Sequence, residues 1–174
     1  MKTADIPVFL LCGGLGTRLK EETEFRPKPM VPIGEHPILW HVMQVYAKHG
    51  FRRFVLCLGF KADVVKDYFS NFHLHNNDCT IALKSNKITV HESRVNLDWE
   101  VTLAYTGEKN MTGSRVAQAA RKYLGKAKHF AVTYGDGLTD ANLAEEFRHH
   151  LTEKKLGTVL GVNPPSRFGE IKVA

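Results

Sequence analysis

The sequence has few cysteines, no long apolar run and no internal repeat, and each absence removes a class of protein. Its three cysteines, Cys12, Cys57 and Cys79, are odd in number and widely spaced, which argues against a disulfide framework or a zinc site. The N-terminal apolar stretch ends in glycines and is too short for a secretory signal or a membrane span. We therefore expect a cytoplasmic protein with no membrane partner.

The charges are mixed along the chain, and no low-complexity segment is present. Hydrophobic residues make up 43% and charged residues 24% of 174 residues, which is typical of one compact domain with a core. The formal net charge is +6, but Lys and Arg alternate with Asp and Glu and form no basic stripe. This pattern argues against a nucleic-acid partner and favours a phosphorylated small molecule. Assembly into a homo-oligomer stays open.

Strand-like and helix-like segments alternate along the chain. Continuous apolar runs, typical of strands buried on both faces of a parallel sheet, occupy residues 6–12, 54–60, 130–135 and 157–163. Segments with helical spacing of apolar residues occupy 37–49, 61–70, 114–124 and 141–154. Within 77–106 two stretches alternate apolar and polar residues without a helix between them, which predicts a β-hairpin-like insertion followed by a further strand.

This order of elements predicts the fold class. Alternating strands and helices indicate an α/β protein with an open, mostly parallel, Rossmann-like sheet flanked by helices. Ligands of such sheets bind beyond the carboxyl ends of the strands. The residues that follow the apolar runs are therefore the first candidates for a functional site.

The loop after the first apolar run, within "LLCGGLGTRL" at 10–19, contains Gly13, Gly14 and Gly16. A dinucleotide fingerprint needs a third spaced glycine where Leu19 stands, which counts against NAD, and no Lys-Ser or Lys-Thr pair completes a P-loop. A glycine loop whose backbone N–H groups approach polyphosphate oxygens remains, with Thr17 and Arg18 as side-chain donors. A plain tight turn is the alternative.

Two more positions carry candidate chemistry. In "RPKPM", prolines on both sides of Lys28 stiffen the backbone and direct an ammonium group that can neutralise a reacting phosphate. Asp136 follows the apolar run 130–135 between two glycines, where a carboxylate can hold one hard cation; a Gly-Asp-Gly turn without chemistry is the alternative. Asp140 is expected to be a helix N-cap.

Several of these motifs occur together in a known family. The combination of "GGLGTRL", "PKPM" and "IGEHPILWH" resembles the N-terminal signature of the sugar-1-phosphate nucleotidyltransferases. The stretches "EETEFRPKPMVPIG", "TGEKNMTGSRV", "AVTYGDGLTD" and "PPSRFGE" follow in order along essentially the whole chain, and they look like the glucose-1-phosphate cytidylyltransferase branch. A glutamine-rich loop, expected in the thymidylyl and uridylyl branches, is replaced here by "TGEKNMTGSR", which favours CTP.

The resemblance implies a fold of the nucleotidyltransferase type and an activity. The family branch joins CTP and α-D-glucose 1-phosphate to give CDP-glucose and pyrophosphate, for deoxysugars of surface polysaccharides. CTP and a sugar 1-phosphate are therefore the expected partners. A sister enzyme that uses UTP, dTTP or GTP, a nucleotide-binding module without turnover and an unrelated NAD-dependent enzyme remain as alternatives.

The resemblance also assigns residues. It implies catalytic roles for Arg18 and Lys28 on the phosphates, and Mg²⁺ as the cofactor, held by Asp136. Nucleotide binding is implied for Leu11, Cys12, Gly13, Gly14, Leu15, Gly16, Thr17, Arg18, Lys28, Asn110, Arg115 and Gly135. We expect residues 1–174 to be the nucleotide-binding part of a single nucleotidyltransferase domain, whose C-terminal part lies outside this sequence.

Overall fold

The computed structural model describes residues 2–14, 25–91 and 97–162. The chain divides into two compact units, Met1–Ala141 and Asn142–Ala174, and each is described by itself. No helix in the described part of the chain is both long and apolar enough to cross a membrane.

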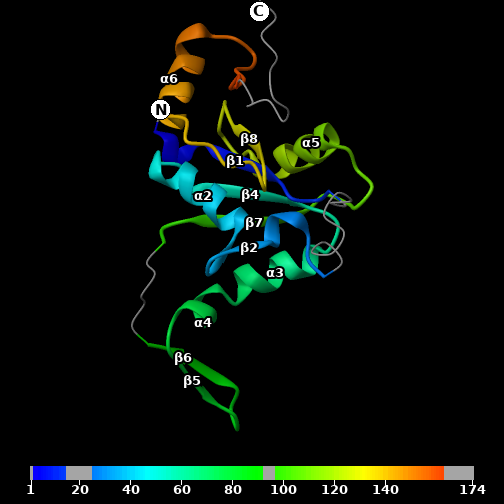
Figure 1. Cartoon of the computed structure of the whole chain (residues 1–174), viewed down its shortest axis with the longest axis vertical. Coiled ribbons are helices and arrows are strands. Elements are labelled where there is room, and N and C mark those ends of the chain that lie inside the picture. Colours follow the sequence, from blue (N-terminus) through cyan, green and yellow to red (C-terminus); the bar gives the residue numbers. More distant parts are fainter. Residues whose placement is uncertain (1, 15–24, 92–96, 163–174) are drawn as a thin grey trace, which may run out of the picture. The chain divides into compact units, whose positions relative to one another are not determined.

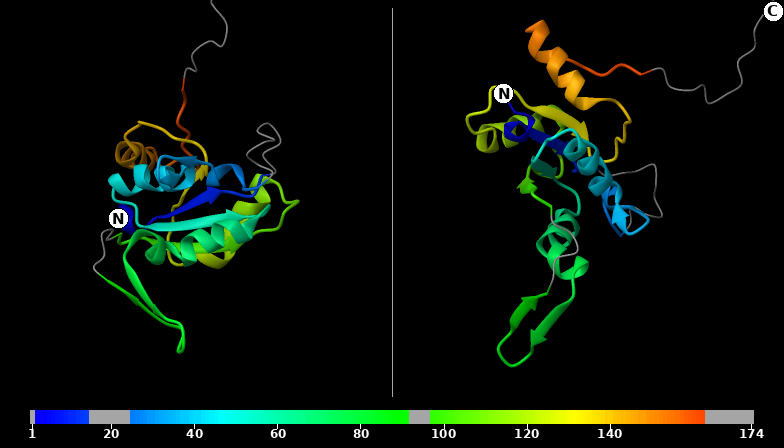
Figure 2. Two further views of the ribbon diagram at one scale, coloured as in Figure 1. Left: turned by 60° about the horizontal axis from the view of Figure 1, so that its bottom comes forward. Right: turned by 90° about the vertical axis from the view of Figure 1, so that its left-hand side faces the viewer.

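The first unit is built on a parallel four-stranded sheet (Figure 1). Its strands are β1 (Pro7–Leu11), β4 (Arg53–Leu58), β7 (Glu100–Tyr105) and β8 (Ala131–Tyr134), in the order β7-β4-β1-β8. β1 and β4 lie side by side and point the same way in the left view of Figure 2, with Phe9 opposite Val55. The predicted α/β architecture is confirmed, since each parallel pair needs a crossover connection.

The two central strands are apolar throughout because both of their faces are covered. On one face, Phe9 and Val55 pack in a core cluster with Ala119 of α5 (Thr112–Tyr123). On the other face, Phe54 contacts Trp99 edge-on, with ring centroids 5.3 Å apart. Trp99 in turn lies 6.1 Å from Trp40 of α2 (Ile38–Lys48). The continuous apolar runs therefore mark strands between two layers of helices.

Most of the remaining predicted elements of this unit are also present. The helix expected over 61–70 is α3 (Ala62–Ser70), and a short helix α4 (Phe72–Asn76) follows it. The hairpin-like insertion is confirmed as β5 (Cys79–Ala82) and β6 (Lys87–Val90), which pair antiparallel and form a two-stranded sheet of their own. The short elements are η1 (Thr3–Asp5), η2 (Lys28–Met30), β2 (Pro32–Ile33) and β3 (His36–Pro37).

The second unit contains the helix α6 (Leu143–Glu153), as expected from the spacing over 141–154. Its N-cap is Asn142, whose side chain accepts from the Glu145 backbone N–H, so the expectation that Asp140 caps it is wrong. The strand expected over 157–163 is also wrong for the part that the structure describes, since residues 157–162 form no strand. An apolar run becomes a strand only where a neighbouring strand supplies hydrogen-bond partners.

Candidate nucleotide-binding site

The carboxyl ends of the four parallel strands meet at one edge of the sheet, and a glycine lies within two residues of each end. These are Gly13 after β1, Gly59 after β4, Gly107 after β7 and Gly135 after β8. Backbone hydrogen bonds continue the strand ladder beyond the strand ends, from Cys12 N to Cys57 O at 3.1 Å and from Gly135 N to Leu11 O at 3.1 Å. The candidate residues therefore sit on backbone that the sheet itself holds in place.

Gly135 lies where three segments approach closely. A Cβ on this residue would lie 2.8 Å from Sγ of Cys12 and 3.0 Å from Cγ of Pro29. Pro29 belongs to η2, the turn that begins at Lys28, and is buried. The close packing explains why the position is glycine, and it brings the β1 loop and the lysine turn against the end of β8.

Lys28 and Asp136 form an ion pair between Nζ and Oδ2, and their side chains are 43% and 23% exposed. The sequence assigned these residues to a phosphate and to a metal cation, so their contact places the two expected sites side by side. The carboxylate of Asp136 already binds a cation here, the Lys28 ammonium. Among the residues the structure describes, no cluster of three or more His, Cys, Asp or Glu side chains could hold a metal ion by itself.

This donor set fits Mg²⁺, which proteins often hold through one or two carboxylates while substrate phosphates and water complete its coordination. Asp136 supplies one such carboxylate. It follows a strand end, next to the backbone of Gly135. The ammonium group of Lys28 lies next to this carboxylate.

Arg115, in the first turn of α5, is the most highly connected side chain at this edge and is only 4% exposed. It donates five hydrogen bonds, of which four go to backbone carbonyls and one to a hydroxyl. The acceptors are Asn110 O (2.9 Å, from Nε), Leu58 O (3.2 Å) and Thr106 Oγ1 (3.1 Å, both from Nη1), and Gly13 O (3.0 Å) and Glu108 O (2.9 Å, both from Nη2). The guanidinium thus joins the loop after β1, the last residue of β4 and the loop after β7.

Asn110 lies in the loop between β7 and α5 with a fixed amide orientation. Its Nδ2 donates to Thr106 O at 2.5 Å, and because a carbonyl only accepts, the amide nitrogen must face it. Gly107, which adopts a positive φ of 85°, leaves room for this amide. The loop that the resemblance assigned to the base and ribose is therefore well ordered by contacts within the chain.

Two residues of this edge, Thr106 and Gly59, were not among the sequence candidates. Thr106 is 2% exposed, and its hydroxyl donates to Leu58 O at 2.8 Å while accepting from Arg115. A Cβ on Gly59 would lie 2.5 Å from Nη1 of Arg115. Gly59 directly follows β4 and Thr106 directly follows β7, and this position was a usable signal, because the carboxyl end of every strand in a parallel sheet faces the ligand edge.

The thiols of Cys12 and Cys57 are buried at the ends of β1 and β4. Burial raises the pKa of the Cys12 thiol far above its ordinary value, and the nearby Cys57 and Asp136 raise it further. Burial also raises the pKa of Cys57 to about 11, while the positive charge of Arg115 lowers it. Both cysteines are therefore neutral thiols at physiological pH.

We expect a thiol reagent such as DTNB to label one cysteine rapidly at pH 8. Cys79 is exposed on β5 and should react first, whereas Cys12 and Cys57 should react at least about 100-fold more slowly, because thiolates are the reacting species. Cys79→Ser should remove the fast phase of labelling alone; two rapidly reacting thiols would contradict the burial of the others.

The pKa of Cys57 in the folded protein is raised above its ordinary value of 9.0. The stability that its neutral thiol contributes is therefore present below pH 9 and is lost as the pH rises towards 11.

The remaining loop residues, Leu15, Gly16, Thr17 and Arg18, lie outside the described residues. Their assignment to the nucleotide stays a prediction. Leu11, Cys12, Gly13 and Gly14 are described and lie at the end of β1.

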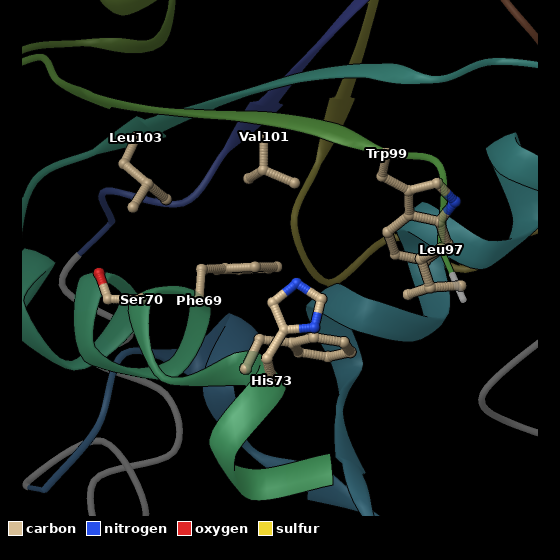
Figure 3. Close-up of a pocket in the computed structure, with 8 residues that line it drawn as sticks. Phe69, Ser70, His73, Leu97, Trp99, Val101 and Leu103 are labelled. Carbon is tan, nitrogen blue, oxygen red and sulfur yellow. The ribbon is translucent and has the colours of Figure 1, made fainter. Parts of the chain in front are cut away.

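Two hollows formed by described residues of the first unit differ in their suitability for a nucleotide. A pocket of about 230 Å³ between β7 and the helices α3 and α4 is lined mainly by apolar side chains, including Phe69, Val101 and Leu103 (Figure 3). It offers Ser70 and His73 as polar side chains, which does not suit a polyphosphate. An open groove of about 560 Å³ includes Leu11, Thr112 and Tyr134, and it adjoins the candidate site at the strand ends.

An open parallel sheet with glycines, a lysine and an aspartate at its strand ends defines an α/β protein of the nucleotide-binding type. The chain belongs to the nucleotidyl transferase family, which it matches over residues 8–174. This family assignment confirms the resemblance found in the sequence.

The chain is similar to glucose-1-phosphate cytidylyltransferase of Salmonella typhimurium, with 44% identity over 94% of this chain and 63% of that protein. It is 37% identical to the probable glucose-1-phosphate cytidylyltransferase of Bacillus subtilis, again over 94% of this chain and 63% of that protein. Among solved structures, HddC from Yersinia pseudotuberculosis complexed with GMP-PN has a TM-score of 0.59 and 28% identity, covering 84% of this chain and 54% of that one. The chain thus spans 63% of the length of these two curated relatives.

Proposed function

We propose that this chain is the nucleotide-binding part of a glucose-1-phosphate cytidylyltransferase, which joins CTP and α-D-glucose 1-phosphate to give CDP-glucose and pyrophosphate. The observation that carries the proposal is the contact between Lys28 and Asp136 at the strand ends. It brings an ammonium group beside a carboxylate, and transfer of a nucleotidyl group needs a cation for the phosphates and a carboxylate for the metal ion. The identity to the cytidylyltransferase of Salmonella typhimurium, 44% over 94% of this chain, supports the choice of substrates.

In this reaction a sugar phosphate oxygen attacks the α-phosphorus of CTP, and pyrophosphate leaves. No covalent enzyme intermediate is needed, so the protein aligns the two substrates and stabilises the developing charge. The backbone of Gly13, Gly14 and Gly135 would approach the nucleotide. Lys28 would move its ammonium from Asp136 to the phosphates, and Thr17 and Arg18 would donate to them from the loop.

Asp136 would hold Mg²⁺, with phosphate oxygens and water as the other ligands. When bound, the metal neutralises phosphate charge and polarises the phosphoryl oxygens. The role of Asp136 is to fix that charge next to the end of β8, and Asn110 would contact the base or ribose from the loop before α5. We place the activity in the cytoplasm, where nucleoside triphosphates are available.

One observation favours a second candidate with a different base. The solved structure HddC, which is 28% identical to this chain, is complexed with GMP-PN, so a guanylyltransferase is the alternative. The cytidylyltransferase relatives match more of this chain, 94% against 84%, and at higher identity, which favours cytidine.

The test is thermal unfolding of the chain with CTP, UTP, dTTP, GTP or NAD, each with and without Mg²⁺. A ligand at one hundred times its dissociation constant adds about 2.7 kcal/mol, which raises the melting temperature of a domain of this size by about 5–10 °C. We expect CTP with Mg²⁺ to give the largest shift. Lys28→Ala should reduce that shift, and Lys126→Ala, at an exposed position away from the strand ends, should not. A larger shift with GTP would favour the alternative, and a shift with NAD alone would contradict nucleotidyl transfer.

A further inference from the structure

We propose that the hairpin formed by β5 and β6 is a self-association element, whose apolar face is covered by a second copy of this chain. The proposal concerns a surface outside the nucleotide site and does not depend on the proposed function. It rests on the register of the two strands, on the exposure of their side chains and on an apolar pocket at the base of the hairpin.

The pairing of β5 with β6 divides the hairpin into two faces of different chemistry. Residues directly opposite each other in an antiparallel pair share a face, and successive residues of one strand alternate between the faces. The register puts apolar side chains and a thiol on one face, in the pairs Cys79–Val90 and Ile81–Ile88. It puts two hydroxyls, a methyl group and an ammonium group on the other face, in the pairs Thr80–Thr89 and Ala82–Lys87. The two strands therefore place no charged side chain on the first face, which we call the apolar face.

The apolar face is open to solvent in the single chain. Ile81 is 52% exposed, Ile88 47% and Val90 39%, while Leu83 in the turn is 85% exposed. Among the strands that the structure describes, β5 and β6 pair only with each other, and both views of Figure 2 show the hairpin extending away from the four-stranded sheet. A two-stranded hairpin is at best marginally stable in water by itself, and contiguous exposed apolar patches mark interaction sites. We therefore expect the apolar face to be covered.

The small area of this face indicates what kind of cover it needs. Strands of four residues give a face about 13 Å long and about 10 Å wide. Such a face is far smaller than the area of about 800 Å² that each partner contributes to a stable interface. The contact must therefore extend from the hairpin onto a further apolar surface.

The chain carries such a surface at the base of the hairpin. The apolar pocket beside β7 is lined by side chains from residues 69–73, which precede the hairpin, and from residues 97–103, which follow it (Figure 3). No residue of the hairpin belongs to this lining, so the hairpin leaves the pocket of its own chain open. One molecule thus has both an apolar protrusion and an apolar hollow. This self-complementarity favours a second copy as the partner, because a symmetric contact would cover both hairpins and both pockets at once.

The first measurement is the oligomeric state by sedimentation equilibrium, at chain concentrations up to about 100 μM. The parent chain is compared with Ile88→Lys and with the control Thr89→Lys. These neighbouring residues of β6 lie on opposite faces, and the two variants add the same charge. We expect the parent to self-associate and Ile88→Lys to raise the dissociation constant of the assembly at least about 100-fold, because a lysine would be buried there without a partner. Thr89→Lys should change the constant less than about threefold.

Three results of this measurement would overturn the proposal. The first is a parent chain that stays monomeric at the highest concentration, which would mean that a different partner covers the apolar face. The second is an Ile88→Lys variant that assembles as tightly as the parent. The third is an equal loss of assembly in Ile88→Lys and Thr89→Lys, since added charge and not the face would then be the cause.

Cys79 provides a second readout, because its thiol lies on the apolar face and is exposed in the single chain. The rapid labelling expected for this thiol applies to the dissociated chain at low concentration. As the parent assembles, the labelling rate should fall at least about tenfold, since a covered thiol is protected from the reagent. In Ile88→Lys the rate should stay high at every concentration. An assembled parent whose Cys79 still reacts at the rate of the dissociated chain would place the interface elsewhere and contradict the proposal.

A further variant keeps the test decisive if Ile88→Lys does not fold. Ile81→Lys changes the residue directly opposite on β5 and should weaken the assembly by a similar factor. Circular dichroism of each variant checks that the four-stranded sheet is intact. If folded Ile81→Lys assembles as tightly as the parent, the apolar face is not the interface and the proposal is overturned.

Discussion

Asp136→Asn is expected to remove the Mg²⁺ dependence of nucleotide binding. The parent chain should bind CTP at least about tenfold more tightly with Mg²⁺ than without it, because the metal links the Asp136 carboxylate to the phosphates. The asparagine variant should show less than about a twofold difference, since a neutral amide is a weak ligand for a hard cation. Calorimetric titration of CTP at a series of Mg²⁺ concentrations measures both.

The control for this prediction is Asp140→Asn, which removes a nearby exposed carboxylate and changes the net charge equally. It should keep the Mg²⁺ dependence of the parent. If Asp136→Asn also keeps it, Asp136 serves only the Gly-Asp-Gly turn and the ion pair with Lys28. That result would contradict the proposed metal site, whereas the family assignment would stand.

The second prediction with a large effect is a loss of stability when a buried side chain of the sheet is truncated. Phe9→Ala should lower the free energy of unfolding by about 3–5 kcal/mol, because Phe9 is fully buried in the cluster that joins β1 to α5. In a domain of this size the melting temperature should fall by about 6–20 °C. Urea unfolding followed by circular dichroism gives the free energy, and a thermal scan gives the temperature.

Phe130 is the matched control, because its ring contacts that of Phe9 edge-on at 5.3 Å but is 43% exposed. Phe130→Ala should cost less than half as much as Phe9→Ala, since much of its surface is already in water. Equal losses would mean that the two rings act as one buried unit, which would contradict the burial of Phe9 between covered layers.

Much of the fold could be predicted because its signals are local. The apolar runs of β1, β4 and β8 and the helical spacing over 37–49 each lie within one short segment, and they correspond to elements of the structure. The prediction from the sequence was wrong where strand formation depends on pairing with another strand. Residues 157–162 have the composition of a buried strand, yet they form none, because a strand depends on a neighbour that no local pattern specifies.

The candidate site likewise has a part that could be predicted from the sequence and a part that could not. Lys28, Asp136 and Gly135 could be chosen from residue type and from their place after apolar runs or between prolines. The contact of Lys28 with Asp136 joins segments far apart in the chain, and no spacing rule predicts such a contact. The same limit applies to the backbone acceptors of Arg115, because backbone carbonyls carry no sequence signature.

The space that Gly13 and Gly59 leave for Arg115 restricts how the sequence can evolve. A larger residue at position 13 or 59 would collide with the guanidinium, whereas a smaller side chain at position 115 would first free the space. The order of substitutions therefore matters: a lineage could replace Arg115 and only later lose either glycine, but not the reverse. Gly13 and Arg115 lie more than 100 positions apart in the sequence, and they should accordingly be conserved together.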